Sequence, residues 1–177
     1  MQWTIDPAHS SIEFSVRHLG IATVRGRFTK FTGGAELDVR GRLQTIAATI
    51  DAASIDTGVA PRDTHLRSAD FFDVARFPTI TFRSTAIAPR ADGTLDLTGD
   101  LTMRGETKPV RFALEASAPI RDPWGNPRAA ASATGTLSRK AWGLTWNQVL
   151  ELGGVAVADE IRFTLDIQAV AAQAAAA

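Results

Sequence analysis

Hydrophobic and polar residues alternate along most of the chain with a period of two. In the segment 11–18, Ile12, Phe14 and Val16 fall on one side, and polar or charged residues separate them. Side chains of a strand point alternately to its two faces, so this pattern predicts strands with one buried face, as in antiparallel sheets. Some strand-like segments are expected to be halves of one long, bent strand. About ten segments show the pattern: 2–6, 10–19, 23–31, 34–40, 44–51, 79–88, 94–103, 109–118, 129–138 and 160–170.

Turn signals lie between these segments. Asp92-Gly93 separates two alternating runs and predicts a tight hairpin turn. Arg104-Gly105 is expected to join the next pair of strands. Further glycines are expected at other joins: Gly33-Gly34, Gly41 and Gly153-Gly154.

The alternation stops between residues 53 and 78, where short helical stretches are predicted. Pro61 suits the first position of a helix, because its missing N–H would be unpaired there in any case. Ser68 is expected to cap a second short helix with Asp70 in its first turn. At the other end of the chain, seven of the nine residues from Ala169 to Ala177 are alanine. We therefore predict one domain over residues 1–170 and a disordered, alanine-rich tail over residues 171–177.

Many antiparallel strands in one domain must protect their edges, and closure into a barrel does this most completely. The sequence thus predicts an all-β antiparallel barrel with a helical insertion around residues 53–78. A barrel of about eight strands is either filled by its side chains or holds one small ligand. The nine phenylalanines and four tryptophans suit both cases.

Composition narrows the class of protein. The chain has 177 residues, no cysteine, and nineteen Lys and Arg that balance nineteen Asp and Glu. Absence of cysteine excludes disulfides, thiol catalysis and cysteine-ligated metals. Zero net charge argues against a nucleic-acid partner and gives little protection from self-association, so a homodimer is a possible state. No apolar run is long enough for a transmembrane helix, and the first residues lack a signal-peptide pattern, so we expect a cytoplasmic protein.

The sequence carries no catalytic motif that we recognise. The three histidines, His9, His18 and His65, lack the i, i+4 spacing of a helical zinc site, and no Gly-x-Ser-x-Gly elbow or phosphate-binding glycine loop occurs. We predict no catalytic residue, no metal and no cofactor. His18 continues the face of Val16, so it is either a polar group in a ligand pocket or a satisfied core histidine. The polar run 62–67 is either a locally bonded helical turn or a polar lip at a barrel mouth.

Several long motifs occur in a fixed order from residue 3 to about residue 169, and together they resemble the YceI-like family of lipid-binding proteins. The motifs are WTIDPAHS (3–10), FSVRHL (14–19), SIDTG (54–58), RDTHLRSADFFDV (62–74), FPTITF (77–82), GDLTMRGETKPV (99–110) and SRKAWGL (138–144).

This resemblance implies an extended, eight-stranded, lipocalin-like antiparallel barrel around an elongated apolar cavity. The expected function is non-catalytic binding, storage or transport of a long-chain amphiphile, such as a polyisoprenoid, an isoprenoid quinone or a fatty-acid derivative. The apolar chain is expected to lie against Phe14, Val16, Phe28, Ile80, Phe82, Phe112, Trp142 and Trp146. The polar head group is expected to meet Arg17, His18, Arg25, Arg62 or His65.

Two alternatives stay open from the sequence. The first is a filled barrel that serves as an interaction module in a stress-related complex. The second is an enzyme on a lipid-like substrate, with His18 or His65 as acid or base.

Overall fold

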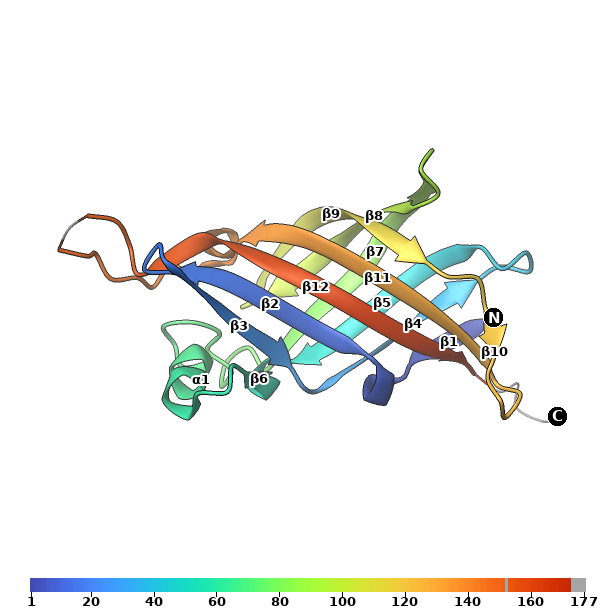
Figure 1. Cartoon of the computed structure of the whole chain (residues 1–177), viewed down its shortest axis with the longest axis horizontal. Coiled ribbons are helices and arrows are strands. Elements are labelled where there is room, and N and C mark those ends of the chain that lie inside the picture. Colours follow the sequence, from blue (N-terminus) through green and yellow to red (C-terminus); the bar gives the residue numbers. More distant parts are fainter. Residues whose placement is uncertain (152, 173–177) are drawn as a thin grey trace.

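The computed structural model describes residues 1–151 and 153–172, which form a long β-barrel with a helical segment at one end (Figure 1). The helical elements are η1 (Pro7–His9), η2 (Ala52–Ser54), α1 (Ala60–Arg67) and η3 (Arg139–Trp142). The strands are β1 (Gln2–Ile5), β2 (Ser11–His18), β3 (Ala22–Phe28), β4 (Phe31–Leu37), β5 (Leu43–Asp51), β6 (Ile55–Asp56), β7 (Thr79–Pro89), β8 (Leu95–Met103), β9 (Glu106–Ala116), β10 (Ile120–Arg121), β11 (Pro127–Ser138) and β12 (Val157–Ala171).

The predicted eight-stranded antiparallel barrel is confirmed. Its strands follow the order β11-β9-β8-β7-β5-β4-β1-β12, and pairing of β11 with β12 closes the ring. The register between these two strands runs without a break from Arg128↔Val170 to Ser138↔Glu160. Strand alternation therefore separates an inner face from an outer one along the whole wall.

Some neighbouring segments are halves of one bent strand, as the sequence predicted. β1 pairs with the end of β12 at Ala169–Ala171, and β2 pairs with residues 157–166 of the same strand. The helical turn η1 lies between the two halves. β12 continues to Ala171, one residue beyond the predicted domain end, and residues 173–177 of the predicted tail lie outside the described residues.

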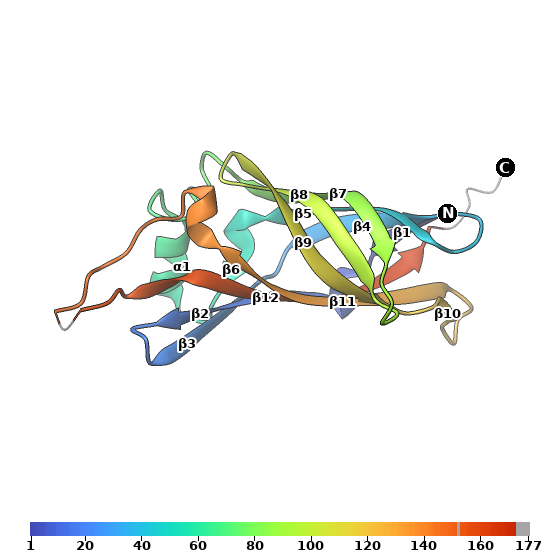
Figure 2. The same cartoon turned by 90° about the horizontal axis from the view of Figure 1, so that it is seen from above.

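The first helix predicted for the insertion is confirmed, and the prediction of a second helix is wrong. α1 begins at Ala60 with Pro61 in its first turn, and β6 pairs with β3 beside it. Figure 2 shows α1 at the end of the barrel opposite the β4–β5 hairpin. No second helix follows Ser68. The Ser68 N–H and Oγ both donate to the His65 carbonyl, so Ser68 ends α1 instead, and the chain continues in turns through Asp73 at φ 48°. No helix in the described ranges is long and apolar enough to cross a membrane.

The turns differ in detail from the predicted ones. Arg104 and Gly105, at φ 51° and 76°, form a two-residue turn between β8 and β9, as their positive φ values allow. The turn at Asp92-Gly93 is one residue longer than a two-residue turn, because the Arg90 N–H donates to the Thr94 carbonyl. The prediction of a join at Gly33-Gly34 is wrong. Both residues lie inside β4, where a Cβ on Gly34 would overlap the carbonyl oxygen of Trp3 on β1.

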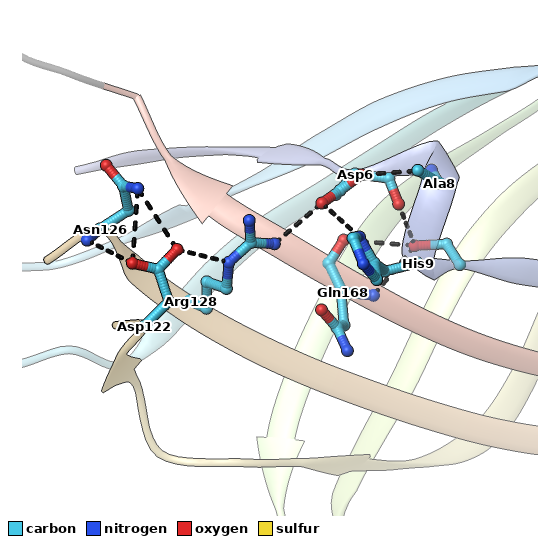
Figure 3. A network of polar contacts seen from close by, with 8 residues as sticks. Asp6, Ala8, His9, Asp122, Asn126, Arg128 and Gln168 are labelled. Atoms are coloured by element: carbon cyan, nitrogen blue, oxygen red, sulfur yellow. Dashed lines mark hydrogen bonds and ion pairs between the residues drawn. The ribbon is translucent and has the colours of Figure 1, made fainter. Parts of the chain in front are cut away.

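A polar network fixes the end of the barrel that lies opposite α1 (Figure 3). The Arg128 Nη1 atom lies 2.8 Å from Asp6 Oδ2, and its Nε donates to Asp122 Oδ2 at 2.9 Å. Asp122 Oδ1 also accepts the backbone N–H groups of Trp124 and Asn126. One arginine on β11 thus ties the start of the chain to the β10–β11 loop. Its hydrogen bond lowers the pKa of Asp122 from 3.8 to about 2.

This network makes a testable prediction for stability against pH. A carboxyl with a lowered folded-state pKa stabilises the protein above its unfolded pKa, and that stabilisation is lost as pH falls through the folded pKa. We expect Asp122→Asn to lower the Tm at pH 6, and we expect this difference to shrink between pH 4 and about pH 2. Thermal unfolding followed by circular dichroism at each pH measures it. Asp100→Asn, at an exposed position of β8, is the matched control, and a pH-independent difference would contradict the assignment.

Candidate functional site

The barrel encloses a cavity of about 1050 Å³. Its wall is made largely of aliphatic and aromatic side chains from the inner faces of the strands. The buried residues Leu97 and Leu114 form part of the wall on β8 and β9, and Ile80 forms part of it on β7. Few polar side chains interrupt this surface. An apolar cavity of this size suits a small apolar molecule or the chain of an amphiphile.

The two ends of the cavity differ. At one end its walls are the buried residues Phe71, Met103 and Leu144, which we call the closed end. α1 and the turns after it pack there, against the core of the barrel. At the other end the lining residues are exposed, and we call this end the mouth. The mouth is formed by the β4–β5 hairpin and by the segment after β9: Arg40, Gly41, Arg42, Ser117, Ala118 and Pro119.

Three phenylalanine rings lie directly over glycines of the wall. Phe14 pairs with Gly26 across β2 and β3, and Phe163 pairs with Gly135 across β12 and β11. A Cβ on either glycine would overlap the ring of its partner. A Cβ on Gly99 would likewise overlap the ring of Phe82 on the neighbouring strand β7. The rings occupy the space of the missing side chains, so they cover the wall without filling the lumen.

Two of these rings, those of Phe82 and Phe163, form an aromatic belt together with Phe112. The Phe112 ring centroid lies 6.0 Å from that of Phe82 and 5.3 Å from that of Phe163. The three residues stand on β7, β9 and β12, and two of them cover glycines of the intervening strands β8 and β11. The belt therefore spans five neighbouring strands of the wall, with tilted and edge-on contacts that aromatic rings favour.

Six of the eight residues predicted for the apolar cavity line it: Phe14, Val16, Phe28, Ile80, Phe82 and Phe112. The other two, Trp142 and Trp146, are not among its lining residues. Trp142 is buried in the core, where its Nε1 donates to the Leu101 carbonyl at 3.1 Å. Trp146 packs against Phe71 and His65 behind the closed end, with ring centroids 5.3 and 4.7 Å away.

None of the five residues predicted for the head group lines the cavity. On β2 the lining ends at Val16, and His18 lies beyond it, beside Ala22 and Val157. Arg17 is exposed and donates to Thr23 and to the Gly20 carbonyl within its own hairpin. Arg25 is exposed on β3.

The polar run 62–67 holds the insertion together. Arg62 donates to the hydroxyl and the carbonyl of Thr57, and the buried Asp63 accepts from the Thr57 N–H at 2.9 Å. The His65 Nε2 lies 2.8 Å from Asp70 Oδ2. Arg67 donates to two carbonyls of the chain before α1. These contacts fit the alternative of a locally bonded helical segment. That any of the five residues meets a ligand stays a prediction.

Sequence reasoning did not single out Arg139, which lines the cavity and is 4% exposed. Its guanidinium donates to four backbone carbonyls, of Leu144, Trp146, Val157 and Ala158. Burial lowers the pKa of this arginine. It ties the chain after η3 to β12 and so helps to build the closed end. A lone arginine next to a strand end gives no sequence signal for this role.

The described residues contain no group of three His, Asp or Glu side chains placed to hold a metal ion. The histidines named as candidate acids or bases, His18 and His65, both lie outside the cavity lining. The cavity itself offers a largely apolar surface, with exposed residues at the mouth.

The fold and the cavity define a class of protein, the closed antiparallel barrel with an apolar lumen. The chain belongs to the YceI-like family, whose domain matches residues 3–169. A UPF0312 protein of Vibrio cholerae is 40% identical over 138 residues, which are 77% of this chain and 73% of the relative. A UPF0312 protein of Ectopseudomonas mendocina is also 40% identical over 138 residues, covering 77% of this chain and 72% of that protein.

Two solved structures share the fold. BcnA of Burkholderia cenocepacia matches with a TM-score of 0.80 and 24% identity, over 93% of this chain and 98% of its own. A domain from Saccharophagus degradans matches with a TM-score of 0.72 and 15% identity, over 96% of this chain and 98% of its own. The latter is described as a polyisoprenoid binding domain implicated in plant cell wall breakdown.

The packing of the Phe163 ring on Gly135 predicts that substitutions at these two positions are coupled in the free energy of unfolding. Gly135→Ala forces the Phe163 ring off the wall, so we expect a cost of about 1–3 kcal/mol in the free energy of unfolding, as in overpacked cores. In a Phe163→Ala background the same substitution should cost less, because no ring opposes the new methyl group. Urea unfolding of the four proteins of this cycle measures the coupling. Equal costs in both backgrounds would show that the ring does not occupy the place of the missing side chain.

Proposed function

We propose that this protein binds a long-chain amphiphilic lipid, of the isoprenoid or fatty-acid type, and stores or carries it without chemical change. The observation that carries the proposal is the apolar cavity of about 1050 Å³, closed at one end and open at the mouth. Membership in the YceI-like family and the fold shared with a polyisoprenoid binding domain support it.

The size and composition of the cavity supply the driving force. Burial of each methylene group contributes about 0.8 kcal/mol, so a chain of ten or more carbons gains enough to offset its lost freedom. Without a ligand, water in a lumen of about 1050 Å³ would find few polar partners there. Release of such water on binding gives the negative heat-capacity change of apolar burial.

The geometry also orients the ligand in this proposal. The closed end is walled by apolar residues, whereas exposed Arg40 and Arg42 line the mouth. The chain enters first, and the head group stays at the mouth, within reach of these arginines rather than of the five residues that the sequence suggested. Arg42 already pairs with Asp38 at 2.8 Å, so Arg40 is the better candidate for an anionic or carbonyl head group.

The alternatives have less support. A filled barrel does not fit the cavity. An enzyme that uses His18 or His65 does not fit the placement of these residues outside its lining. Homodimer formation and cytoplasmic location stay predictions from the sequence.

The direct test is native mass spectrometry of the protein purified without added lipid, followed by organic extraction. We expect a bound long-chain species close to one per protein, and extraction identifies its head group. If the mass is bare, titration with cis-parinaric acid, a fluorescent long-chain probe, decides the question. A protein that neither retains a lipid nor binds this probe would contradict the proposal.

A pair of adjacent residues on β5 tests the location of the ligand. Ala48 lines the cavity and pairs with Phe82, whereas its neighbour Ala47 is exposed on the outer face. We expect Ala48→Phe to weaken binding of cis-parinaric acid by at least about tenfold, which corresponds to about 1.4 kcal/mol. Ala47→Phe, the matched control, should bind as the wild type does. Equal affinities of the two variants would show that the probe binds outside the barrel.

A further inference from the structure

Three apolar side chains near the mouth are exposed, and packing within the described residues does not account for them. Val39, at the tip of the β4–β5 hairpin, is 103% exposed. Across the mouth, Ile120 on β10 is 67% exposed and Trp124 in the β10–β11 loop is 81% exposed. An exposed tryptophan and two exposed aliphatic side chains thus lie at one opening, and exposed apolar surface beside a ligand cavity is one mark of a site that contacts a protein or a membrane.

Two of these side chains are next in sequence to residues that line the mouth of the cavity. Val39 precedes Arg40, and Ile120 follows Pro119, and both Arg40 and Pro119 are lining residues of the mouth. Figures 1 and 2 show the β4–β5 hairpin and the β10–β11 loop at the same end of the barrel in both views. The two loops that carry the exposed apolar side chains thus also contribute residues to the mouth of the cavity.

Positive charge accompanies the apolar side chains. Arg40 follows Val39, and Arg121 follows Ile120. In the part of the chain that the structure describes, neither guanidinium pairs with a carboxylate; Arg121 donates to the Gly125 carbonyl at 2.8 Å. Each loop therefore presents an aliphatic side chain next to an arginine whose charge is not neutralised by an acid.

Hydrogen bonds to Asp122 hold the loop that carries Trp124 in place. Asp122 accepts the Trp124 N–H at 3.0 Å and the Asn126 N–H at 2.9 Å, and Arg128 fixes this carboxylate (Figure 3). The backbone is thus fixed, while the Trp124 side chain remains largely exposed. A fixed loop that exposes its largest apolar side chain is expected where that side chain inserts into another surface.

We propose that this rim, composed of Val39, Arg40, Ile120, Arg121 and Trp124, docks the mouth onto an anionic lipid bilayer. Tryptophan favours the interface between water and hydrocarbon, and arginines near a surface of anionic lipids are attracted to it. The inference rests on the proposed lipid-binding function. A long chain that passes through water exposes every methylene group, whereas a mouth docked on the bilayer lets the chain pass directly between membrane and lumen.

The opposite end of the barrel supplies a contrast. Ile21 and Val149 there are 80% and 85% exposed. However, the cavity is closed on that side by Phe71 and Leu144, so contact with a bilayer at that end would not let a chain enter. Exposed apolar side chains and arginines without a carboxylate partner among the described residues also occur at that end, where Arg17 and Arg25 flank Ile21. The position of the rim at the open mouth therefore selects the docking end.

The test uses the full chain and two kinds of vesicle, one of phosphatidylcholine alone and one that also contains phosphatidylglycerol. We expect sedimentation with the anionic vesicles, severalfold weaker binding to the neutral ones, and weaker binding as salt rises. We also expect vesicles with brominated acyl chains to quench tryptophan emission, and this quenching should be lost in Trp124→Phe. Trp3 and Trp142 are buried and Trp146 packs against His65 and Phe71 at the opposite end, so Trp124 is the tryptophan placed to enter the bilayer.

Matched variants separate docking from lipid binding. Trp124→Ala with Arg121→Gln should reduce vesicle binding at least tenfold and leave binding of cis-parinaric acid in solution unchanged, because neither residue lines the cavity. Ile21→Ala at the opposite end should leave both unchanged. Docking is overturned if the wild type ignores the anionic vesicles, binds both kinds equally, or loses binding in Ile21→Ala. Failure of cis-parinaric acid to bind the wild type would instead contradict the proposed lipid-binding function.

Discussion

The pairing of β11 with β12 is the constraint on which the rest of the structure depends. Eleven residue pairs in unbroken register turn an open sheet into a closed tube. Closure satisfies the backbone groups that an edge strand would expose, and it also creates an inside. Once the ring is closed, the period-two pattern of each strand decides which side chains face the lumen. The cavity and its apolar wall follow from that closure, and the helical insertion then closes one end.

Much of the wall could be predicted because it depends on a local property. Alternation alone assigns Phe14, Val16 and Phe82 to the inward faces of their strands, and these residues line the cavity. The bounds of most strands also follow from the same pattern, to within a few residues. Pattern reasoning failed where the local signal was ambiguous. Ser68 suits a helix start, but here its hydroxyl ends a helix by donating to the carbonyl of His65.

The ends of the cavity could not be predicted, because they are assembled from segments far apart in the sequence. Arg40 and Pro119 both line the mouth only because the strand order brings their loops to the same end of the barrel. Trp146 is as aromatic as any lining residue, yet it packs behind the closed end, against the ring of His65. Whether a residue in an irregular segment faces the lumen or the core depends on tertiary packing, which periodicity does not encode.

The glycines beneath the phenylalanine rings have a consequence for how cavity width differs between members of a family. Gly26, Gly99 and Gly135 are covered by rings and are not themselves lining residues, yet each one sets how far its ring stands from the wall. Two barrels with the same lining side chains would therefore differ in the width of the cavity if one had alanine at such a position. The width of the molecule that fits is encoded partly in residues that never touch it, and comparison of contact residues alone would miss them.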